Sequence, residues 1–282
     1  MKPIFGIDVT LDKNNEVING EEFITRVVSS QKKAVFDEKT ENFDETIKKS
    51  QLPLGLQIAN YVCGLFALIV LVGVLRAGNI VTAFENAPVL IICGILCAIA
   101  WLVLYVISKK KEKAVLTEEK ADEQVEDINT DIDEIFEELD VPASAPFVDV
   151  LLFRYAAQGD EIKVKTVGMQ MAEYFNIQFR IYQRDGYLHL ANVDDVHSFK
   201  LSEIKAIRTV KKRISLMSWN KEVGPTEEKY KKYKLTVNQF DNVFVKPYHI
   251  LEIEHDGQIY GLFFPSYELD TFEILTGLKA EE

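Results

Sequence analysis

The sequence predicts a membrane-anchored protein of the α+β class, with a two-helix transmembrane hairpin, an acidic helical stalk and a mainly antiparallel β domain closed by a C-terminal helix. Three observations indicate this class. Two long runs without a charged residue lie close together, an acidic segment with helical periodicity follows them, and the rest of the chain alternates apolar and polar residues around tight turns. The chain has 282 residues, which is enough for a hydrophobic core besides the two spans.

The two uncharged runs occupy residues 51–75 and 86–108 and are 25 and 23 residues long. A helix needs roughly 20 apolar residues to cross the hydrocarbon core of a bilayer. The first run begins behind a charged segment, and it is longer than the roughly 7–15 apolar residues of a signal sequence. We therefore expect two transmembrane helices, and not a signal sequence or a pair of buried helices in a soluble core.

Lysines at the ends of the two runs predict the orientation of the hairpin. Two lysines precede the first run and four follow the second, whereas the connecting loop at 76–85 carries one arginine and one glutamate. Basic residues near the ends of spans stay on the cytoplasmic side. We therefore expect a multi-pass protein of the cell membrane with two spans, a short extracytoplasmic loop and both termini in the cytoplasm.

The residues inside the spans indicate an anchor rather than a transport path. Neither span contains Asp, Glu, Lys, Arg or His, the residue types that line ion and proton paths. All three cysteines lie within the spans, so they indicate neither a disulfide framework nor a zinc site. The small residues Gly94 and Ala98, like Cys63 and Ala67, allow close helix packing. They favour packing of the two spans on each other, with dimerisation as the alternative.

The segment 109–141 combines a basic anchor with an acidic amphipathic helix. From residue 114 to residue 140 there are twelve acidic residues and one lysine, so this stretch carries nearly all of the net charge of −12. Two interpretations remain open: a coiled coil that joins two copies of the chain through residues 121–139, or a single helix laid against the following domain. Both rest on apolar residues at steps of four and three, the pattern of a heptad seam: Ala121, Val125, Ile128, Ile132, Ile135 and Leu139.

Residues 143–282 are expected to form a cytoplasmic domain made mostly of antiparallel strands. Alternating stretches flank the dipeptides Asp185-Gly186 and Asp256-Gly257, which have the composition of two-residue hairpin turns. A further hairpin is expected around Gly159. Beyond Pro265 the apolar residues recur at helical spacing, which predicts one closing helix.

Ser266 is the expected N-cap of this closing helix. The order of strands and helix resembles the pleckstrin-homology-like (PH-like) fold, a strongly bent antiparallel sheet plugged at one end by a C-terminal helix. The stretches GYLHLANVDDVHSFKLSEIKAIRTVKKRIS and HILEIEHDGQIYGLFFPSYELDTFEILTGL are similar to parts of bacterial domains of this family, the second to their last hairpin and helix. The resemblance covers residues 145–280 and implies a domain that binds proteins or, in some members, phosphoinositides.

The N-terminal segment 1–50 is expected to hold a short strand hairpin followed by a helix or linker. Ile7, Val9 and Leu11 alternate with polar residues, and Asn19-Gly20 has the composition of a turn. So few residues cannot bury a core of their own. We therefore expect the strand at 7–11 to pair with the sheet of the cytoplasmic domain.

The candidate binding surface is a basic run between residues 205 and 234, which holds ten Lys or Arg and three Glu. Basic side chains gain about 1 kcal/mol each near anionic headgroups, and tryptophan suits the membrane interface. Four interpretations remain open: contact with anionic lipid, a solvated strand surface, docking of the acidic stalk and, least favoured, nucleic acid. The candidate lipid- or partner-binding residues are Lys205, Arg208, Lys211, Lys212, Arg213, Trp219 and Lys221.

The sequence contains no phosphate-binding glycine loop, zinc-protease helix or nucleophile elbow. The four histidines lack metal-ligand spacing, and His189 and His255 are expected to face solvent. We therefore expect no enzymatic activity, cofactor, metal or nucleic-acid partner. The expected function is that of a scaffold or adaptor whose domain binds a protein or anionic lipid headgroups. The alternative is an accessory subunit of a larger membrane complex, such as a transporter or an envelope-synthesis assembly.

Overall fold

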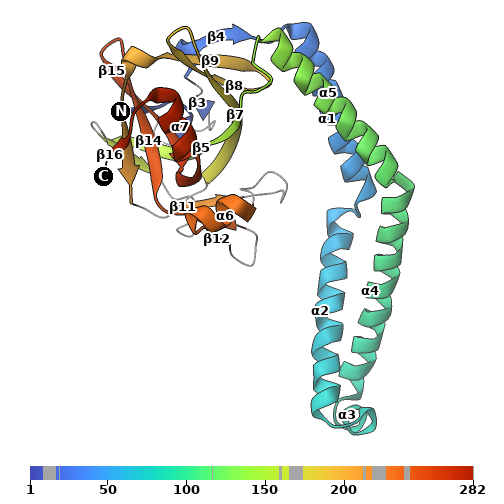
Figure 1. Cartoon of the computed structure of the whole chain (residues 1–282). Coiled ribbons are helices and arrows are strands. Elements are labelled where there is room, and N and C mark those ends of the chain that lie inside the picture. Colours follow the sequence, from blue (N-terminus) through green and yellow to red (C-terminus); the bar gives the residue numbers. More distant parts are fainter. Residues whose placement is uncertain are drawn as a thin grey trace. The chain divides into compact units, whose positions relative to one another are not determined.

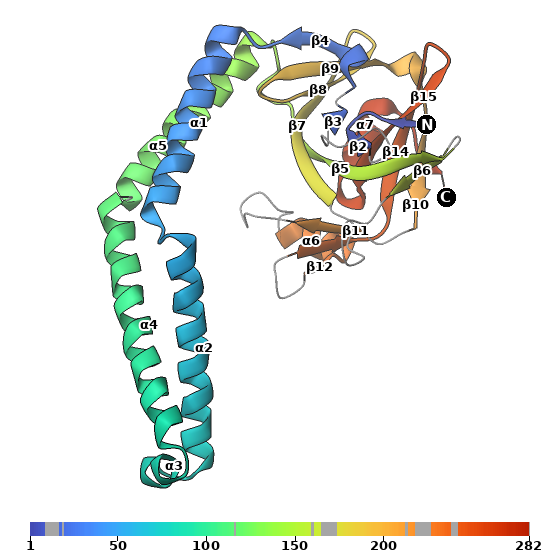
Figure 2. The same cartoon turned by 180° about the vertical axis from the view of Figure 1, so that it is seen from behind.

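The computed structural model describes residues 1–8, 17–18, 20–115, 117–158, 161–164, 174–211, 214–217, 227–237 and 242–281. The chain forms two compact units: residues 1–33 and 133–282 make the sheet unit, and residues 34–132 make the helical unit. The boundary crosses two long helices, α1 (Ser30–Ser50) and α5 (Glu118–Glu138), each of which has residues in both units. Figures 1 and 2 show the elements of each unit from two sides.

The helical unit contains two helices that are long and apolar enough to cross a membrane. They are α2 (Leu54–Arg76) and α4 (Pro88–Val115), which lie side by side and are joined through the short helix α3 (Ile80–Asn86) (Figure 1). The apolar stretches of α2 and of residues 88–112 have mean hydropathies of 2.5 and 2.9, and only 6% and 11% of them is buried. A core helix of a soluble domain would be mostly buried, so this exposure distinguishes α2 and α4 from core helices.

Glycine lets α2 and α4 approach closely at two points. A Cβ atom on Gly94 would lie 2.6 Å from Cγ1 of Val70, and a Cβ atom on Gly64 would lie 2.9 Å from the indole ring of Trp101. Both distances are shorter than a van der Waals contact between carbon atoms, so a larger residue would push the helices apart. For Gly94 this confirms that the small residue serves the packing of the two helices on each other.

The acidic helix α5 lies beside α1 and runs in the opposite direction. In the helical unit, Lys39 Nζ of α1 lies 3.0 Å from Asp127 Oδ1 and 2.8 Å from Asp131 Oδ2. Hydrogen bonds to Asp131 and Asp127 raise the pKa of Lys39. In the sheet unit, Lys32 Nζ lies 3.4 Å from Glu134 Oε2. At these positions acidic residues of α5 form ion pairs with lysines of α1.

The sheet unit is mainly antiparallel, and its described strands form three sheets. The largest has eight strands, with β6 (Glu161–Val164) paired to β5 and the others in the order β3 (Val17–Ile18), β2 (Gly6–Asp8), β5 (Phe147–Gln158), β7 (Tyr174–Arg184), β8 (Tyr187–Ala191), β9 (Asp195–Lys200) and β4 (Ile24–Val27). The second has the order β1 (Lys2–Pro3), β15 (Gln258–Pro265), β14 (Tyr248–His255), β10 (Ile204–Val210) and β16 (Ala280–Glu281). The third has the order β11 (Ile214–Met217), β13 (Asn242–Val245) and β12 (Thr236–Val237).

The expected hairpins are confirmed. Asp185 and Gly186 join β7 to β8 with φ angles of 52° and 80°, and the second Asp-Gly dipeptide joins β14 to β15 with φ angles of 49° and 75°. Two successive residues with positive φ give the turn that matches the twist of a hairpin, and Asp followed by Gly adopts it readily. The hairpin of β5 and β6 is also present, with Gln158 paired to Glu161, whereas Gly159 lies outside the described residues.

A C-terminal helix follows the last hairpin, as expected. This helix, α7 (Leu269–Thr276), stacks Phe272 on Phe264 of β15 with ring centroids 4.0 Å apart, and both side chains are fully buried. The expected N-cap was wrong. Ser266 begins a 3-10 turn at Ser266–Glu268, and this extra turn separates it from the start of α7, where no side chain caps the helix.

The N-terminal segment completes both large sheets. Strand β1 pairs with β15, β2 pairs with β5 and β4 pairs with β9. Ile7 and Asp8 lie beside Arg154 and Tyr155, which confirms the expected pairing for these two residues, and residues 9–11 lie outside the described part. The same segment supplies buried side chains to the main core: Ile4, Phe5 and Phe23.

The end of α5 is fixed to the sheet unit around Asp140. Arg184 Nη1 of β7 lies 2.6 Å from Asp140 Oδ2, and Arg26 Nη1 of β4 lies 3.1 Å from the same atom and donates to the carbonyl oxygen of Leu139 at 2.6 Å. The charge of Arg184 and hydrogen bonds from both arginines lower the pKa of Asp140. Ile135 and Leu139 are each 1% exposed, so the C-terminal part of the seam is buried within its own chain. Pairing of two copies through residues 121–139 stays a prediction.

We predict that the sheet unit folds without the helical unit when residues 1–33 are linked to residues 133–282. Lys32 contacts Glu134, so a short Gly-Ser linker can bridge the ends. A fragment of residues 143–282 lacks the three N-terminal core side chains, each worth about 2–5 kcal/mol, against a typical total stability of about 5–15 kcal/mol. Circular dichroism on heating should show one cooperative transition for the linked protein, and a similar transition in the fragment would contradict the prediction.

Candidate functional site

The candidate basic residues divide into described and undescribed positions. Lys205 and Arg208 lie on β10, and Lys211 follows this strand directly. The remaining candidates lie outside the described residues: Lys212, Arg213, Trp219 and Lys221. The structure therefore bears on the first half of the basic run and on the lysines that end it.

Two of the three described candidates are neutralised by the neighbouring strand. Arg208 Nε lies 2.6 Å from Glu252 Oε1, and Lys205 Nζ lies 3.6 Å from Glu254 Oε2. Both glutamates are on β14, which pairs with β10 in the antiparallel ladder. Cross-strand pairs of opposite charge stabilise a sheet. Lys205 and Arg208 thus serve the sheet surface, as the interpretation of a solvated strand face requires.

The strand register relates Lys211 to a second lysine that is distant in the sequence. Val210 pairs with Tyr248 and Ile214 pairs with Val245, which places Lys211, directly after β10, and Lys246, directly after β13, between the same two pairs of the strand ladders. Both lysines are exposed and form no ion pair with described residues. We call Lys211 and Lys246 the basic corner. Sequence reasoning missed Lys246, because only the strand register brings it beside Lys211.

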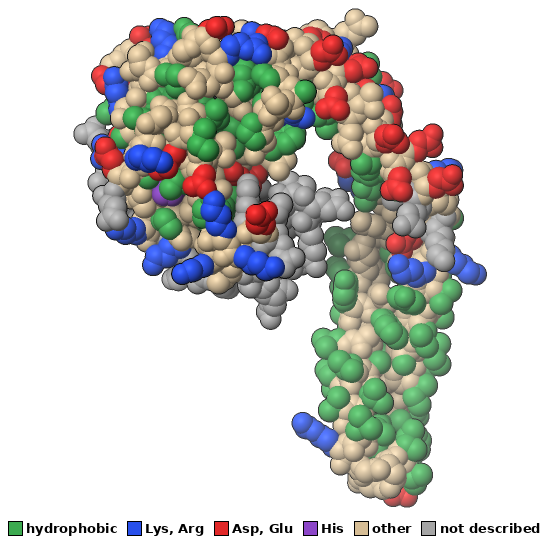
Figure 3. Space-filling model, in the orientation of Figure 1, with side chains coloured by type: hydrophobic (Ala, Val, Ile, Leu, Met, Phe, Trp, Pro, Cys, Tyr) green, Lys and Arg blue, Asp and Glu red, His purple; other side chains and the backbone are tan. Residues whose placement is uncertain are grey.

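Further lysines lie on and after α6 (Glu227–Tyr233), beside the small sheet. Figure 3 shows basic side chains along this edge of the sheet unit. Lys232 forms an ion pair with Asp270 of α7, and Tyr233 Oη donates to Asp270 Oδ2 at 3.1 Å. These contacts lower the pKa of Asp270, with Lys232 as the largest cause. Lys234 is exposed and adds to the positive charge near the basic corner.

The four histidines do not form a common site, and each has its own surroundings. His189 Nδ1 lies 2.8 Å from Ser198 Oγ, His197 Nδ1 lies 3.0 Å from Asp195 Oδ1, and His255 Nδ1 lies 3.0 Å from Glu203 Oε2. His189 and His255 were expected to face solvent, and both are half-buried. Among the described residues, no group of three potential ligands could hold a metal ion.

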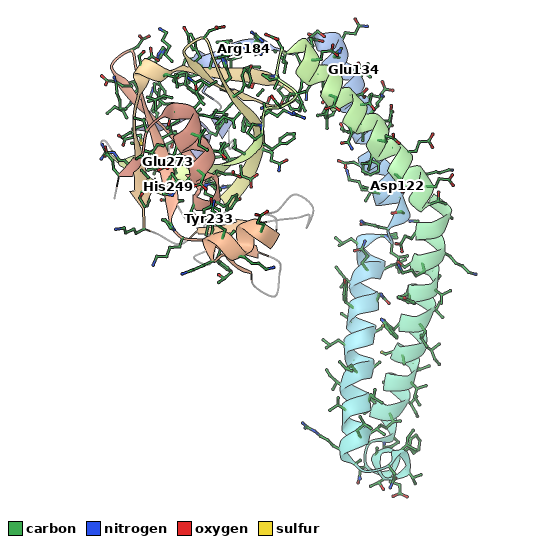
Figure 4. All side chains as sticks on the ribbon, viewed as in Figure 1. Asp122, Glu134, Arg184, Tyr233, His249 and Glu273 are labelled. Carbon is green, nitrogen blue, oxygen red and sulfur yellow. The ribbon has the colours of Figure 1, made fainter. Side chains whose placement is uncertain are left out.

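Of the four histidines, His249 has the largest shift in pKa. It is 3% exposed, lies on β14 near Glu273 of α7, and has Thr209 Oγ1 3.3 Å from its Nδ1 (Figure 4). Burial lowers its pKa to about 4, while the charge of Glu273 acts weakly in the other direction. The imidazole is therefore neutral at physiological pH and packs beside Phe264 as part of the core.

Two buried acidic residues that sequence reasoning missed connect β5 to the turn before α7. Tyr267 Oη donates to Asp149 Oδ2 at 2.6 Å, and the backbone N–H of Asp149 donates to Glu268 Oε1 at 3.2 Å. Buried carboxylates need such donors, because desolvation of an unpaired charge is costly. Their contacts hold the closing turn against the sheet.

No protein-family model matches this chain, and no curated protein and no solved structure is similar enough to match it. The structure itself places the chain in the class of mixed helix-and-sheet proteins, with two apolar helices and a mainly antiparallel sheet unit.

We predict that Arg208→Ala destabilises the protein, whereas Lys211→Ala does not. Arg208→Ala leaves Glu252, which is 7% exposed, without its ion-pair partner. A lost hydrogen bond to a charged group costs on the order of 1–3 kcal/mol. Urea unfolding of the linked sheet unit should show a lower midpoint for Arg208→Ala and an unchanged one for Lys211→Ala. Equal midpoints would show that the pair contributes nothing.

Proposed function

We propose that the chain is an integral membrane protein in which α2 and α4 cross the bilayer as a hairpin, with both termini in the cytoplasm. Hydrophobic side chains cover the visible surface of both helices (Figure 3), and apolar patches of this extent are rare on soluble proteins. The basic residues support the orientation, because six lysines flank the outer ends of the two spans and the connection between them has one arginine.

This topology predicts two results. Alkaline carbonate washing should leave the full-length protein in the membrane pellet. Protease added to intact cells should cleave a tag inserted at residues 76–85 and leave tags at either terminus intact. Cleavage of a terminal tag with protection of the loop would overturn the orientation, and release by carbonate would overturn the membrane-spanning role.

We propose further that the sheet unit is a PH-like binding module, and that the protein acts as a scaffold or adaptor rather than as an enzyme. The antiparallel strands closed by α7 support this class of module. The observation that carries the proposal is the basic corner: two exposed lysines without carboxylate partners among the described residues, beside paired basic residues on the same sheet. Such a corner suits an anionic ligand, either lipid headgroups or an acidic protein surface.

Reversing the basic corner should weaken binding to anionic vesicles. At about 1 kcal/mol per basic residue near the membrane surface, the variant Lys211→Glu with Lys246→Glu should bind at least about tenfold more weakly. Lys2→Glu with Lys200→Glu changes the net charge equally at exposed positions elsewhere and serves as the control. Co-sedimentation of the linked sheet unit with vesicles of rising anionic content measures the effect. Equal binding of both variants would remove the basic corner as the site.

The alternative proposal is an accessory subunit of a larger membrane complex. The exposed apolar surfaces of α2 and α4 support it, because neighbouring spans could cover them. This alternative differs from the first in one result. An accessory subunit would retain its partner only as the full-length protein, whereas a binding module would retain it as the linked sheet unit.

A further inference from the structure

Two adjoining hollows in the helical unit have different chemistry. An apolar groove of about 740 Å³ lies between α2 and α4 and is lined by side chains that include Ala67, Ala98 and Trp101. A polar hollow of about 420 Å³ adjoins it, with Gln57 and Glu112 among its lining residues. Asn60 and Tyr61 line both hollows, so the two adjoin at these residues.

The polar hollow lies at the lysine-rich end of the hairpin. Asn60 is six residues beyond the first residue of α2, a rise of about 9 Å at 1.5 Å per residue. Lys111 Nζ donates to the carbonyl oxygen of Gln51 at 2.7 Å, and Lys109 Nζ lies 2.7 Å from Glu112 Oε2. Tyrosine favours the membrane interface, and Tyr61 and Tyr105 lie toward this end, whereas Trp101 lies against Gly64 near the middle of α2. The polar hollow thus opens at the headgroup end of the spans, with Asn60 at its inner limit, and the groove lies at acyl-chain depth.

Asn60 carries a polar atom that the described chain leaves unsatisfied. Its Oδ1 atom is buried and has no hydrogen-bond partner there, whereas Gln57 Nε2 in the same hollow donates to the carbonyl oxygen of Leu52 at 2.6 Å. An amide oxygen without a donor is costly in an apolar environment. Oδ1 can only accept, so its missing partner is an N–H or O–H donor. Glu112 also lines this hollow, where its carboxylate is paired with Lys109.

We propose that these hollows bind one membrane phospholipid whose headgroup carries a primary ammonium. An acyl chain fills the groove, the ammonium donates to Asn60 Oδ1 near Glu112, and the phosphate lies toward the lysines at the end of α4. The volume of the groove is typical of small-molecule sites, which run from about 300 to 1,000 Å³. An apolar helix of a second copy could fill the groove, but its side chains would not supply the N–H donor that Asn60 Oδ1 lacks. The inference rests on the proposed membrane-spanning role of α2 and α4.

The test compares two lipids of equal charge, of which only one has N–H donors on its headgroup nitrogen; the variant Asn60→Leu separates the donor from the larger size of the other headgroup. Full-length protein in mild detergent is mixed with equal amounts of phosphatidylethanolamine and phosphatidylcholine of identical acyl chains, and bound lipid is counted by native mass spectrometry. Phosphatidylcholine has the same charge but no N–H group. The wild type should retain about tenfold more phosphatidylethanolamine, the ratio expected for one satisfied buried acceptor. A third arm with phosphatidylglycerol separates an ammonium donor from a hydroxyl donor.

Three variants assign the effect to the two hollows. Asn60→Leu removes the acceptor and should abolish the preference between the two lipids. Ala98→Phe fills the groove and should reduce retention of both lipids, whereas Ala100→Phe makes the same change on α4 outside the groove lining and should behave as the wild type.

Equal retention of the two lipids by the wild type, or preference for phosphatidylglycerol, would overturn the inference. A dimer that Ala98→Phe dissociates would overturn it as well, because the groove would then hold a second copy. Carbonate washing of the same membranes keeps the two proposals apart. A protein that stays in the pellet but shows no lipid preference refutes only the lipid site, whereas a protein released by the wash refutes the membrane-spanning role.

Discussion

The junction at the end of α5, where Ile135 and Leu139 are buried beside the ion pairs of Asp140, is the constraint on which the organisation of the sheet unit depends. Asp140 lies just after α5, and its partners Arg184 and Arg26 come from β7 and β4, which lie far apart in the sequence. Arg180 extends the same junction, because its guanidinium carbon lies 4.9 Å and 4.6 Å from the ring centroids of Phe136 and Phe147. Apolar burial of Ile135 and Leu139 accompanies the ionic contacts, so the junction does not rest on exposed charge, which alone contributes little.

The chain leaves the sheet unit and re-enters it at neighbouring points. Strand β4 leads into α1 and pairs with β9, while α5 leads into β5. Lys32 and Ser29 then contact Glu134 and Glu138 across the two chain passages. An inserted helical unit needs this arrangement, because the core uses side chains from before and after the insertion. Residues 1–33 and 133–282 together form the compact sheet unit, and residues 143–282 are only part of it.

In the ion pairs of the stalk and of β10, charge is balanced between elements that lie side by side in the fold. The acidic stalk pairs with lysines of α1, and the basic residues of β10 pair with glutamates of β14. Among the described residues of the sheet unit, this pairing leaves few lysines available to an outside ligand, and the proposed binding surface is therefore the basic corner. In the helical unit the side-chain amide of Gln57 donates a hydrogen bond to a backbone carbonyl, whereas Oδ1 of the neighbouring Asn60 has no partner among the described residues.

Local patterns in the sequence determined the two apolar helices, the Asp-Gly hairpins and the closing helix, because periodicity and turn chemistry act over a few residues. The pairing of Ile7 with the sheet also followed from the sequence, since so short a strand needs a partner. Only the tertiary structure decided that Arg208 faces Glu252, that Lys246 lies at the same place in the strand ladders as Lys211, and that Asp140 binds two arginines. Each of these arrangements joins segments more than thirty residues apart through strand register or packing, which no local pattern encodes. Ser266 shows the same limit on a small scale, because an extra 3-10 turn moved the start of α7 beyond it.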